Sequence, residues 1–290
     1  MVPETMLHLL QQFGRMDWLA FGVRDRIIRH FVNPDKVGPQ EFETDFFGLK
    51  YQGSLNTFID WSVYFYGAYE KGLLYLMRDL LQERQNPVFI DVGANVGQHS
   101  LFMSKFCHEV HAFEPYERVS TLLLAKIALN NLSNIVLHQV GLGDKNEFLD
   151  FYAPEGCNIG TGSFMPDHAA DNNVHIGKLE IVAGDPYIAK LQLPRLDLIK
   201  IDVEGFEKCV LLGLKGTLAR YRPWVVMEYS VSTRNNMSVR ELREILPSDY
   251  RLQKITTNSK YGLFFNRSYY NLTDFDYRNP CTGDLLLLPG

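Results

Sequence analysis

Acidic side chains stand at or near the ends of five separate apolar segments, where a carboxylate contributes nothing to a hydrophobic core. Asp91 lies near the end of the first segment, and Glu114 follows the second. The others come after later segments and are Asp144, Asp202 with Glu204, and Glu228. One buried acid could be a satisfied core group, but acids at all five segments favour a polar cleft. Carboxylates in a cleft can accept hydrogen bonds, take up a proton or bind a cation.

The densest group of these residues is Lys200, Asp202 and Glu204. Their spacing of two puts all three on one face of an extended strand. An internal ion pair between Lys200 and Asp202 is the structural interpretation, and membership of an active site is the functional one. We favour the active site. Glu207, slightly further on, is predicted to begin the following helix, where its charge suits the positive end of the helix dipole.

The elements that position these acids alternate between strand and helix, which predicts a parallel, doubly wound α/β sheet. Its ligands are expected at the carboxyl ends of the strands. The predicted elements are Val88–Val92, Ser100–Phe106, Glu109–Glu114, Val119–Asn130, Ile135–Val140, Leu196–Val203, Phe206–Leu214, Trp224–Tyr229, Arg240–Leu246, Tyr250–Ile255 and Asp284–Leu288. The stretch before Leu193 is less regular, and within it Asp185 is predicted to be the N-cap of a short helix.

Glycines interrupt the chain directly after the first strand, in the segment Gly93–Gly97. Such a turn lets a ligand lie against bare backbone at a helix N-terminus. Glu114 follows about 20 residues later, where a ribose-binding carboxylate belongs in nucleotide folds of this class. The G-x-G-x-x-G fingerprint of dinucleotide binding is missing. The ligand is therefore expected to be a nucleoside carrying an amine, a description that S-adenosylmethionine fits.

The N-terminal region is predicted to form an accessory unit. Met6–Phe31 has the apolar spacing of a packed helix, and Phe42–Leu55 alternates like a hairpin that turns at Gly48 or Gly53. A further helix is expected over Tyr69–Gln82.

Composition excludes several classes of protein. With 46% hydrophobic residues, the 290-residue chain can bury a large core, and its net charge of -5 makes nucleic acid an unexpected partner. Four separated cysteines without a C-x-x-C pair suit a reducing compartment, so a cytoplasmic location is expected. No segment reaches the ~18 apolar residues of a membrane-spanning helix. The oligomeric state stays open.

Six motifs together resemble the FkbM-type methyltransferases, Rossmann-like enzymes that depend on S-adenosylmethionine. They cover Tyr66–Ser230 and are "YGAYE", "FIDVGANVGQHS", "HAFEP", "VGLGDK", "LDLIKIDVEGFEKCVLLG" and "RPWVVMEYS". The resemblance implies a seven-stranded, mostly parallel sheet whose last strand is antiparallel, which "GDLLLLP" could supply. It also implies a methyltransferase domain over residues 66–290, preceded by an accessory or substrate-cap region over residues 1–65.

The resemblance further assigns cofactor-binding residues. Asp91, Gly93, Asn95 and Gly97 would hold the methionine part of S-adenosylmethionine, Glu114 the ribose and Asp144 the adenine edge. Glu70 either reaches the amino end of the cofactor or simply caps its helix. His99 is a candidate for contact with cofactor or substrate.

The implied reaction is methyl transfer to a hydroxyl of a sugar, glycan or polyketide-like metabolite. A nucleotide-linked oxidoreductase and a non-catalytic cofactor-binding module are the alternatives. A hydroxyl acceptor needs a base, for which Asp202 is the first choice and Glu204 the second, with Lys200 beside them. Alternatively Asp202, Glu204 and Glu228 could share a divalent cation such as Mg²⁺.

Overall fold

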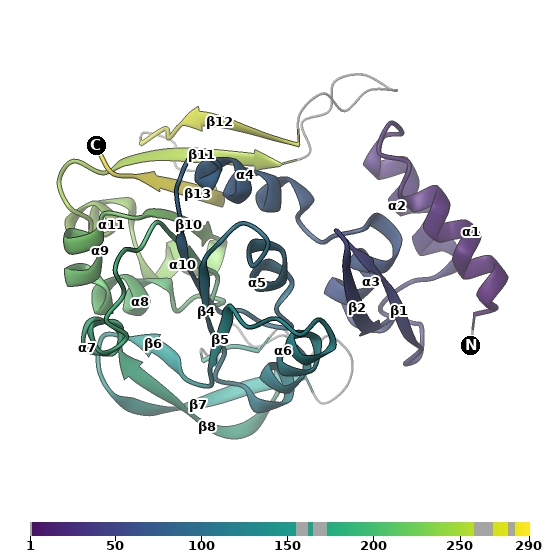
Figure 1. Cartoon of the computed structure of the whole chain (residues 1–290), viewed down its shortest axis with the longest axis horizontal. Helices are drawn as coiled ribbons and strands as arrows, with labels where there is room; N and C mark the ends of the chain where they lie inside the picture. Colours follow the sequence, from purple (N-terminus) through teal and green to yellow (C-terminus); the bar gives the residue numbers. More distant parts are fainter. Residues whose placement is uncertain (1, 155–161, 165–172, 258–268, 278–281) are drawn as a thin grey trace.

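The computed structural model describes residues 2–154, 162–164, 173–257, 269–277 and 282–290. Its centre is an eight-stranded sheet with helices on both faces, as expected for a doubly wound α/β protein (Figure 1). The strands in spatial order are β12 (Tyr270–Asp274), β11 (Arg251–Thr257), β13 (Gly283–Leu288), β10 (Trp224–Tyr229), β9 (Leu198–Ile201), β3 (Val88–Val92), β4 (Glu109–Phe113) and β5 (Ile135–His138).

The strand directions confirm the expected topology. From β10 through β9, β3 and β4 to β5, every neighbouring pair is parallel. The C-terminal strand β13 lies between β10 and β11 and is antiparallel to both, as predicted for "GDLLLLP". The eighth strand, β12, was not predicted and extends the sheet beyond β11.

Alternate residues of the central strands pack into two separate hydrophobic cores, because successive side chains of a strand point to opposite faces. Ile90 and Ile199 lie in one core, whereas Phe89 and Leu198 lie in the other. The first core contains residues of α7 (Gly184–Lys190), α8 (Glu207–Gly213), α9 (Lys215–Tyr221) and α11 (Val239–Ile245). The second contains residues of α4 (Lys71–Leu81), α5 (Gln98–Met103) and α6 (Glu117–Leu129). A short helix, α10 (Val231–Asn236), follows β10.

The less regular stretch before Leu193 contributes a second, three-stranded sheet. Its order is β6 (Gly141–Gly143), β8 (Asn173–Ala183) and β7 (Glu147–Pro154). The prediction for Asp185 was wrong, since the N-cap of α7 is Ala183. The Asp185 carboxylate instead accepts hydrogen bonds from the backbone N–H groups of Gly216 and Thr217, both at 2.7 Å. It therefore caps the first turn of α9, a contact between elements that local sequence does not reveal.

The N-terminal region contains two helices where one was predicted, α1 (Glu4–Gly14) and α2 (Phe21–Phe31). The hairpin of β1 (Glu41–Phe46) and β2 (Leu49–Ser54) turns at Gly48, as expected, and α3 (Phe58–Tyr66) follows. These helices share a small core of their own around the fully buried Trp61. In Figure 1 the unit lies to one side of the large sheet, next to α4. The division into domains at residue 65 stays a prediction.

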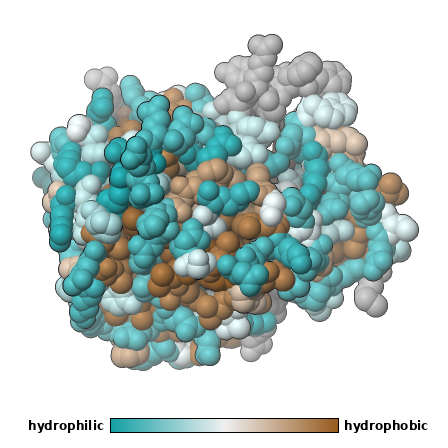
Figure 2. Space-filling view, in the orientation of Figure 1, coloured by the Kyte–Doolittle hydropathy of each residue, from teal (hydrophilic) through white to brown (hydrophobic). Residues whose placement is uncertain are grey.

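The surface mixes polar and apolar side chains. Figure 2 shows apolar side chains interleaved with polar ones over the face where α5, α6 and β5 lie in Figure 1. The exposed apolar residues of these elements and their flanks include Phe106, Leu124 and Val136. Among the described residues, the structure has no helix that is both long and apolar enough to cross a membrane.

Candidate functional site

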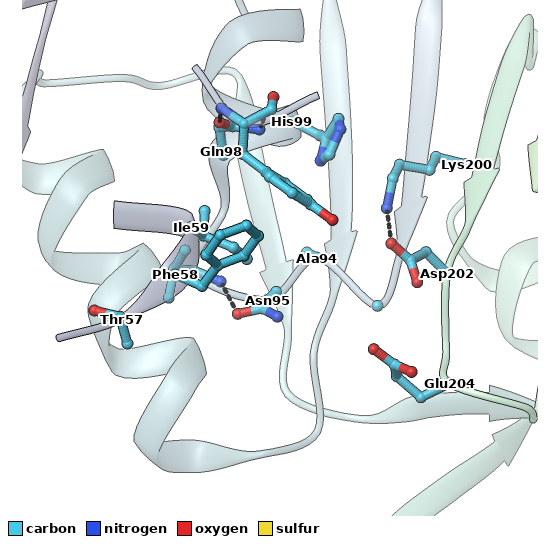
Figure 3. Close-up of a pocket in the computed structure, with 13 residues that line it drawn as sticks. Thr57, Phe58, Ile59, Ala94, Asn95, Gln98, His99, Lys200, Asp202 and Glu204 are labelled. Atoms are coloured by element: carbon cyan, nitrogen blue, oxygen red, sulfur yellow. Dashed lines mark hydrogen bonds and ion pairs between the residues drawn. The ribbon is translucent and has the colours of Figure 1, made fainter. Parts of the chain in front are cut away.

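A cavity opens at the carboxyl ends of β3 and β9, which is where ligands bind in sheets of this kind. We call it the turn cavity, because the glycine-turn residues Gly93–Val96 form part of its wall (Figure 3). It is lined from the end of β9 by Lys200, Asp202 and Glu204. Its remaining lining residues are Thr57, Phe58, Ile59, Tyr69, Gln98 and His99.

The glycine turn adopts the conformation that its sequence requires. Gly93, Asn95 and Gly97 all have positive φ angles, of 79°, 53° and 84°. A Cβ atom on Gly93 would lie 1.9 Å from the backbone oxygen of Asp202, so only glycine lets the turn approach the end of β9 this closely. Gly97 faces α6, because a Cβ atom on this glycine would lie 2.1 Å from a methyl carbon of Leu123. Gly97 thus serves the packing of the turn and is absent from the cavity lining.

Glu114 lies just beyond β4, at the edge of a second cavity that shares Gly93, Asn95, Asp202 and Glu204 with the turn cavity. Its carboxylate accepts hydrogen bonds from the backbone N–H groups of Asn95 and Tyr116, each at 3.0 Å. Burial raises the pKa of Glu114 to about 7. The glutamate therefore holds the glycine turn in place and is positioned to contact a ligand as well. We call this space the Glu114 cavity.

Lys200 and Asp202 form an ion pair with 2.9 Å between Nζ and Oδ2, and Figure 3 shows the two side chains pointing toward each other. The ion pair of the structural interpretation is therefore present, and the same two residues also line the turn cavity, so the favoured active-site role stays a prediction. Asp91 is Lys200's register partner on β3 and is fully buried. Burial opposes the charge of Lys200, but the carboxylates of Asp202 and Asp91 raise its pKa above the usual range. The lysine therefore stays charged.

Asp91 contacts residues of the site but does not itself line the turn cavity. Its Oδ2 accepts a hydrogen bond of 2.7 Å from the hydroxyl of Ser100 on α5, and its Oδ1 is buried without a partner among the described residues. Burial raises the pKa of this carboxyl, although Lys200 opposes the shift. Asp91 does not line the turn cavity or the Glu114 cavity, so its described contacts fit a residue that positions Lys200 and α5.

A third space, the acidic cavity, adjoins the turn cavity through Tyr69, Lys200, Asp202 and Glu204. Its remaining carboxylates are Glu70, Glu228 and Asp284. Burial, reinforced by neighbouring carboxylates, raises the pKa of Glu70 and of Glu228 to about 8 and that of Asp284 to about 6. Lys200 is the one cation among the described lining residues of this cavity.

Glu70 and His99 come together at the edge of this site. Glu70 is the N-cap residue of α4 with φ of 47°, yet its side chain makes no capping hydrogen bond. The prediction that the Glu70 side chain caps this helix is therefore wrong. Its carboxylate instead lies 3.6 Å from the Nε2 of His99. Burial, helped by Lys200, lowers the pKa of His99 well below its usual value, so the imidazole is neutral at physiological pH.

Asp144 is the one predicted cofactor residue that the structure places apart from the others. It follows β6 of the small sheet, its side chain is exposed, and it lines none of the cavities described above. The motif "VGLGDK" suggests a turn after a central strand, whereas Gly141–Gly143 pairs with β8. The assignment of Asp144 to an adenine edge has no support from this position.

Glu207 begins α8 as predicted, but its carboxylate is buried. It accepts hydrogen bonds from the backbone N–H groups of Val203 and Gly205 and, at 2.8 Å, from the hydroxyl of Thr233. These contacts hold the Val203–Gly205 loop, in which Glu204 has a positive φ of 50° and an exposed side chain. Glu207 thus positions Glu204 at the cavity.

Sequence reasoning missed several residues of the site. Gln98 exchanges two hydrogen bonds with the backbone of Tyr69, at 2.5 and 3.0 Å, and so ties α5 to the segment before α4. Tyr69 lines both the turn cavity and the acidic cavity. Asp284 is predicted from the sequence only as the start of a strand. Its isolated charge before four leucines was the signal that could have pointed to the cleft.

The arrangement of potential ligands bears on the metal hypothesis. Among the described residues, no group of three or more His, Cys, Asp or Glu side chains is placed to hold a metal ion. Asp202, Glu204 and Glu228 line the acidic cavity together but do not form such a group.

Comparison with known proteins assigns this chain to a family. A family model described as "Methyltransferase FkbM domain" matches residues 91–253, more than half of the chain. The chain therefore belongs to the FkbM methyltransferase family. The match runs from within β3 into β11 and thus contains the glycine turn, Glu114 and the residues after β9.

Individual relatives are more distant. The chain is 24% identical over 183 residues to the 2-O-methyltransferase NoeI of Sinorhizobium fredii, covering 58% of this chain and 74% of NoeI. It is 28% identical over 154 residues to the hexuronic acid methyltransferase AglP of Haloferax volcanii, covering 49% of this chain and 56% of AglP. The crystal structure of methyltransferase FkbM from Methylobacillus flagellatus aligns with a TM-score of 0.44 at 15% identity, covering 70% of this chain and 43% of that one. The chain spans between 56% and 74% of the length of the curated relatives it matches.

Proposed function

We propose that the protein is an S-adenosylmethionine-dependent O-methyltransferase that acts on a hydroxyl of a sugar, glycan or polyketide-like metabolite. The observation that carries the proposal is the distribution of carboxylates around the glycine turn. Glu114 lines one cavity together with Gly93 and Asn95, whereas Glu70, Glu228 and Asp284 line the acidic cavity. Both cavities share Asp202 and Glu204 with the turn cavity. S-adenosylmethionine carries a ribose next to its adenine and, in its methionine part, a sulfonium and an ammonium group beside a carboxylate, so its ribose and its two cationic groups complement this arrangement.

The residues present fit such a ligand. Each oxygen of Glu114 receives one backbone N–H, and a carboxylate oxygen can accept a second hydrogen bond, here from a ribose hydroxyl. Glu228 lines the acidic cavity, and its Oε2 is buried without a partner among the described residues. A buried acceptor without a donor is costly, and an ammonium group supplies that donor.

When bound, S-adenosylmethionine supplies an activated methyl group. Asp202 is our first candidate to take the proton of the acceptor hydroxyl, because it lies in the turn cavity at the end of β9. Lys200 fixes its carboxylate through the ion pair to Oδ2. Glu204 is the second candidate, and Figure 3 shows both carboxylates on the same side of the cavity, facing the turn at Ala94 and Asn95.

The relatives support a hydroxyl acceptor in a coarse way. The name of NoeI describes transfer to an oxygen atom, and the name of AglP describes a hexuronic acid substrate. Both identities are below 30%, and the family match begins at Asp91, so it does not contain the N-terminal helices.

The experiment is a transfer assay with S-adenosylmethionine labelled with ¹³C in its methyl group. The protein is incubated with a mixture of neutral glycosides, hexuronic acids and hydroxylated polyketides, and the products are examined by NMR. We expect the label as an O-methyl group and an equal amount of S-adenosylhomocysteine. Label on nitrogen or carbon would contradict O-methylation. If none of the acceptors is methylated, the proposed substrate class is contradicted.

A further inference from the structure

A larger cavity lies between the N-terminal helices and the methyltransferase core. We call it the aromatic cavity, because Phe21, Phe58, Tyr66, Tyr69 and Tyr269 contribute to its walls. It shares Phe58 and Tyr69 with the turn cavity and Glu70 with the acidic cavity. A molecule bound there therefore lies next to the place where the methyl group is expected.

Aromatic rings dominate the wall that α2 and α3 provide. Phe21 and Tyr66 pack edge to face with 5.0 Å between their centroids, and Phe58 and Tyr69 do so at 5.6 Å. The guanidinium carbon of Arg24 lies 5.8 Å from the centroid of Phe21 and 6.0 Å from that of Tyr66. Rigid aromatic surfaces of this kind suit the C–H face of a sugar ring, which is apolar although its rim carries hydroxyl groups.

The two cations of the cavity and both of its aspartates already have partners. Arg24 and Lys71 both bind the carboxylate of Asp17, at 3.1 and 2.7 Å. Asp25 receives the hydroxyl of Tyr66 at 3.0 Å and the guanidinium of Arg29 at 3.0 Å. Among the described lining residues, Asp17, Asp25 and Glu70 outnumber the two cations, Arg24 and Lys71. A phosphate or carboxylate ligand would have to compete with Asp17 for those cations.

Arg24 lines the cavity and carries a hydrogen-bond donor that is unsatisfied among the described residues. Its side chain belongs to a residue that is 3% exposed, and its Nε has no partner among the described residues. An uncharged oxygen of a ligand can accept a hydrogen bond from this group without disturbing the ion pair with Asp17.

We propose that the aromatic cavity is the acceptor site and that it takes a neutral sugar unit, one without a phosphate or carboxylate group. This inference rests on the proposed function, since it names the substrate class of the same reaction. The N-terminal helices then select the acceptor, while the core binds the methyl donor. The preference differs from the hexuronic acid named for AglP.

The test compares matched ligands and matched variants. Methyl glycosides of neutral hexoses, the corresponding hexuronic acids and hexose 6-phosphates are titrated into the protein saturated with S-adenosylhomocysteine, and binding is followed by saturation-transfer NMR and calorimetry. We expect at least one neutral glycoside to bind more tightly than its acidic and phosphorylated counterparts. Tighter binding of an acidic counterpart, or no binding by any neutral glycoside, would overturn the proposal.

Three variants locate the binding. Phe21→Ala removes one wall of the cavity and should weaken binding of the neutral glycoside by about threefold or more. Tyr66→Phe keeps the ring and should retain most of the affinity, because its hydroxyl is already engaged by Asp25. Phe31→Ala removes an exposed ring at the other end of the same helix, outside the cavity lining, and should change nothing.

Binding of S-adenosylhomocysteine separates the two proposals. It should be equal in the wild type and all three variants, which also shows that the variants are folded. If Phe21→Ala binds S-adenosylhomocysteine normally and its affinity for the glycoside is unchanged, the assignment of the acceptor site is refuted and the proposed function is not. Failure of the wild type to bind S-adenosylhomocysteine would refute the proposed function as well.

Discussion

Glu228 on β10 and Asp284 on β13 lie directly opposite each other in an antiparallel pair of strands. Like charges in this position are unfavourable, and here both carboxyl groups border the acidic cavity. Burial and the nearby carboxylates of Asp202 and Glu204 raise the pKa of Glu228 to about 8. A protein selected for stability alone gains nothing from this arrangement, which agrees with the proposed binding of a ligand that carries positively charged groups.

The first prediction concerns the pH dependence of stability without ligand. The pKa of Glu228 is higher in the folded than in the unfolded protein, so its contribution to stability is present below about pH 4.5 and is lost as the pH rises through about 8. Glu228→Gln removes this dependence. The variant should match the wild type near pH 4.5 and be more stable at pH 9 in chemical unfolding experiments. Glu244→Gln on α11, an exposed position, serves as the control, and equal stabilities of Glu228→Gln and wild type at about pH 9 would contradict the prediction.

The second prediction concerns Glu114. Glu114→Ala should weaken binding of S-adenosylhomocysteine by roughly 1.5 to 3 kcal/mol, since charge-assisted hydrogen bonds to the ribose are lost. The structure also predicts an effect on stability. The variant leaves the N–H groups of Asn95 and Tyr116 without their acceptor, so unfolding should become easier too.

Calorimetry and thermal unfolding check both effects. Glu117→Ala, at an exposed position in the first turn of α6, is the matched control and should leave binding unchanged. Unchanged affinity in a folded Glu114→Ala protein would remove Glu114 from the cofactor site.

The third prediction distinguishes two explanations for Gly97. A valine at this position could block the cofactor or destabilise the turn. The structure supports the second, because a Cβ there meets Leu123 and the φ angle of 84° disfavours a branched side chain. We expect a clearly lower melting temperature for Gly97→Val. Gly38→Val, at a position with open space around it, should have little effect, and a Gly97→Val protein of normal stability would contradict this explanation.

The fourth prediction concerns the catalytic base. Asp202→Asn keeps the size of the side chain but removes its basicity, so turnover should fall about 10²-fold or more with cofactor affinity retained. The assay is the labelled methyl transfer described above, with a neutral glycoside as acceptor. Retained turnover would exclude Asp202 as the base, and Glu204→Gln would then be the next variant to test.

The parallel core was predictable because its signals are local. The apolar strands Val88–Val92 and Trp224–Tyr229, the glycine turn between β3 and α5, and the acids after β4 and β9 can all be recognised without knowing what packs against them. The remaining features depend on contacts between segments that are distant in the sequence. Asp144 lies apart from the other predicted residues because β6 pairs with β8, so its role stays a prediction. Tyr69 was missed because its place at the cavity depends on hydrogen bonds between its backbone and Gln98 on α5.

The most direct test of the account is a calorimetric titration of the wild-type protein with S-adenosylhomocysteine and, separately, with NAD. Both ligands carry an adenosine, but only S-adenosylhomocysteine has the amino-acid end that the acidic cavity is expected to bind. The account predicts saturable binding of one S-adenosylhomocysteine per chain, weakened in Glu114→Ala, and no comparable binding of NAD. Tight binding of NAD without binding of S-adenosylhomocysteine would contradict it.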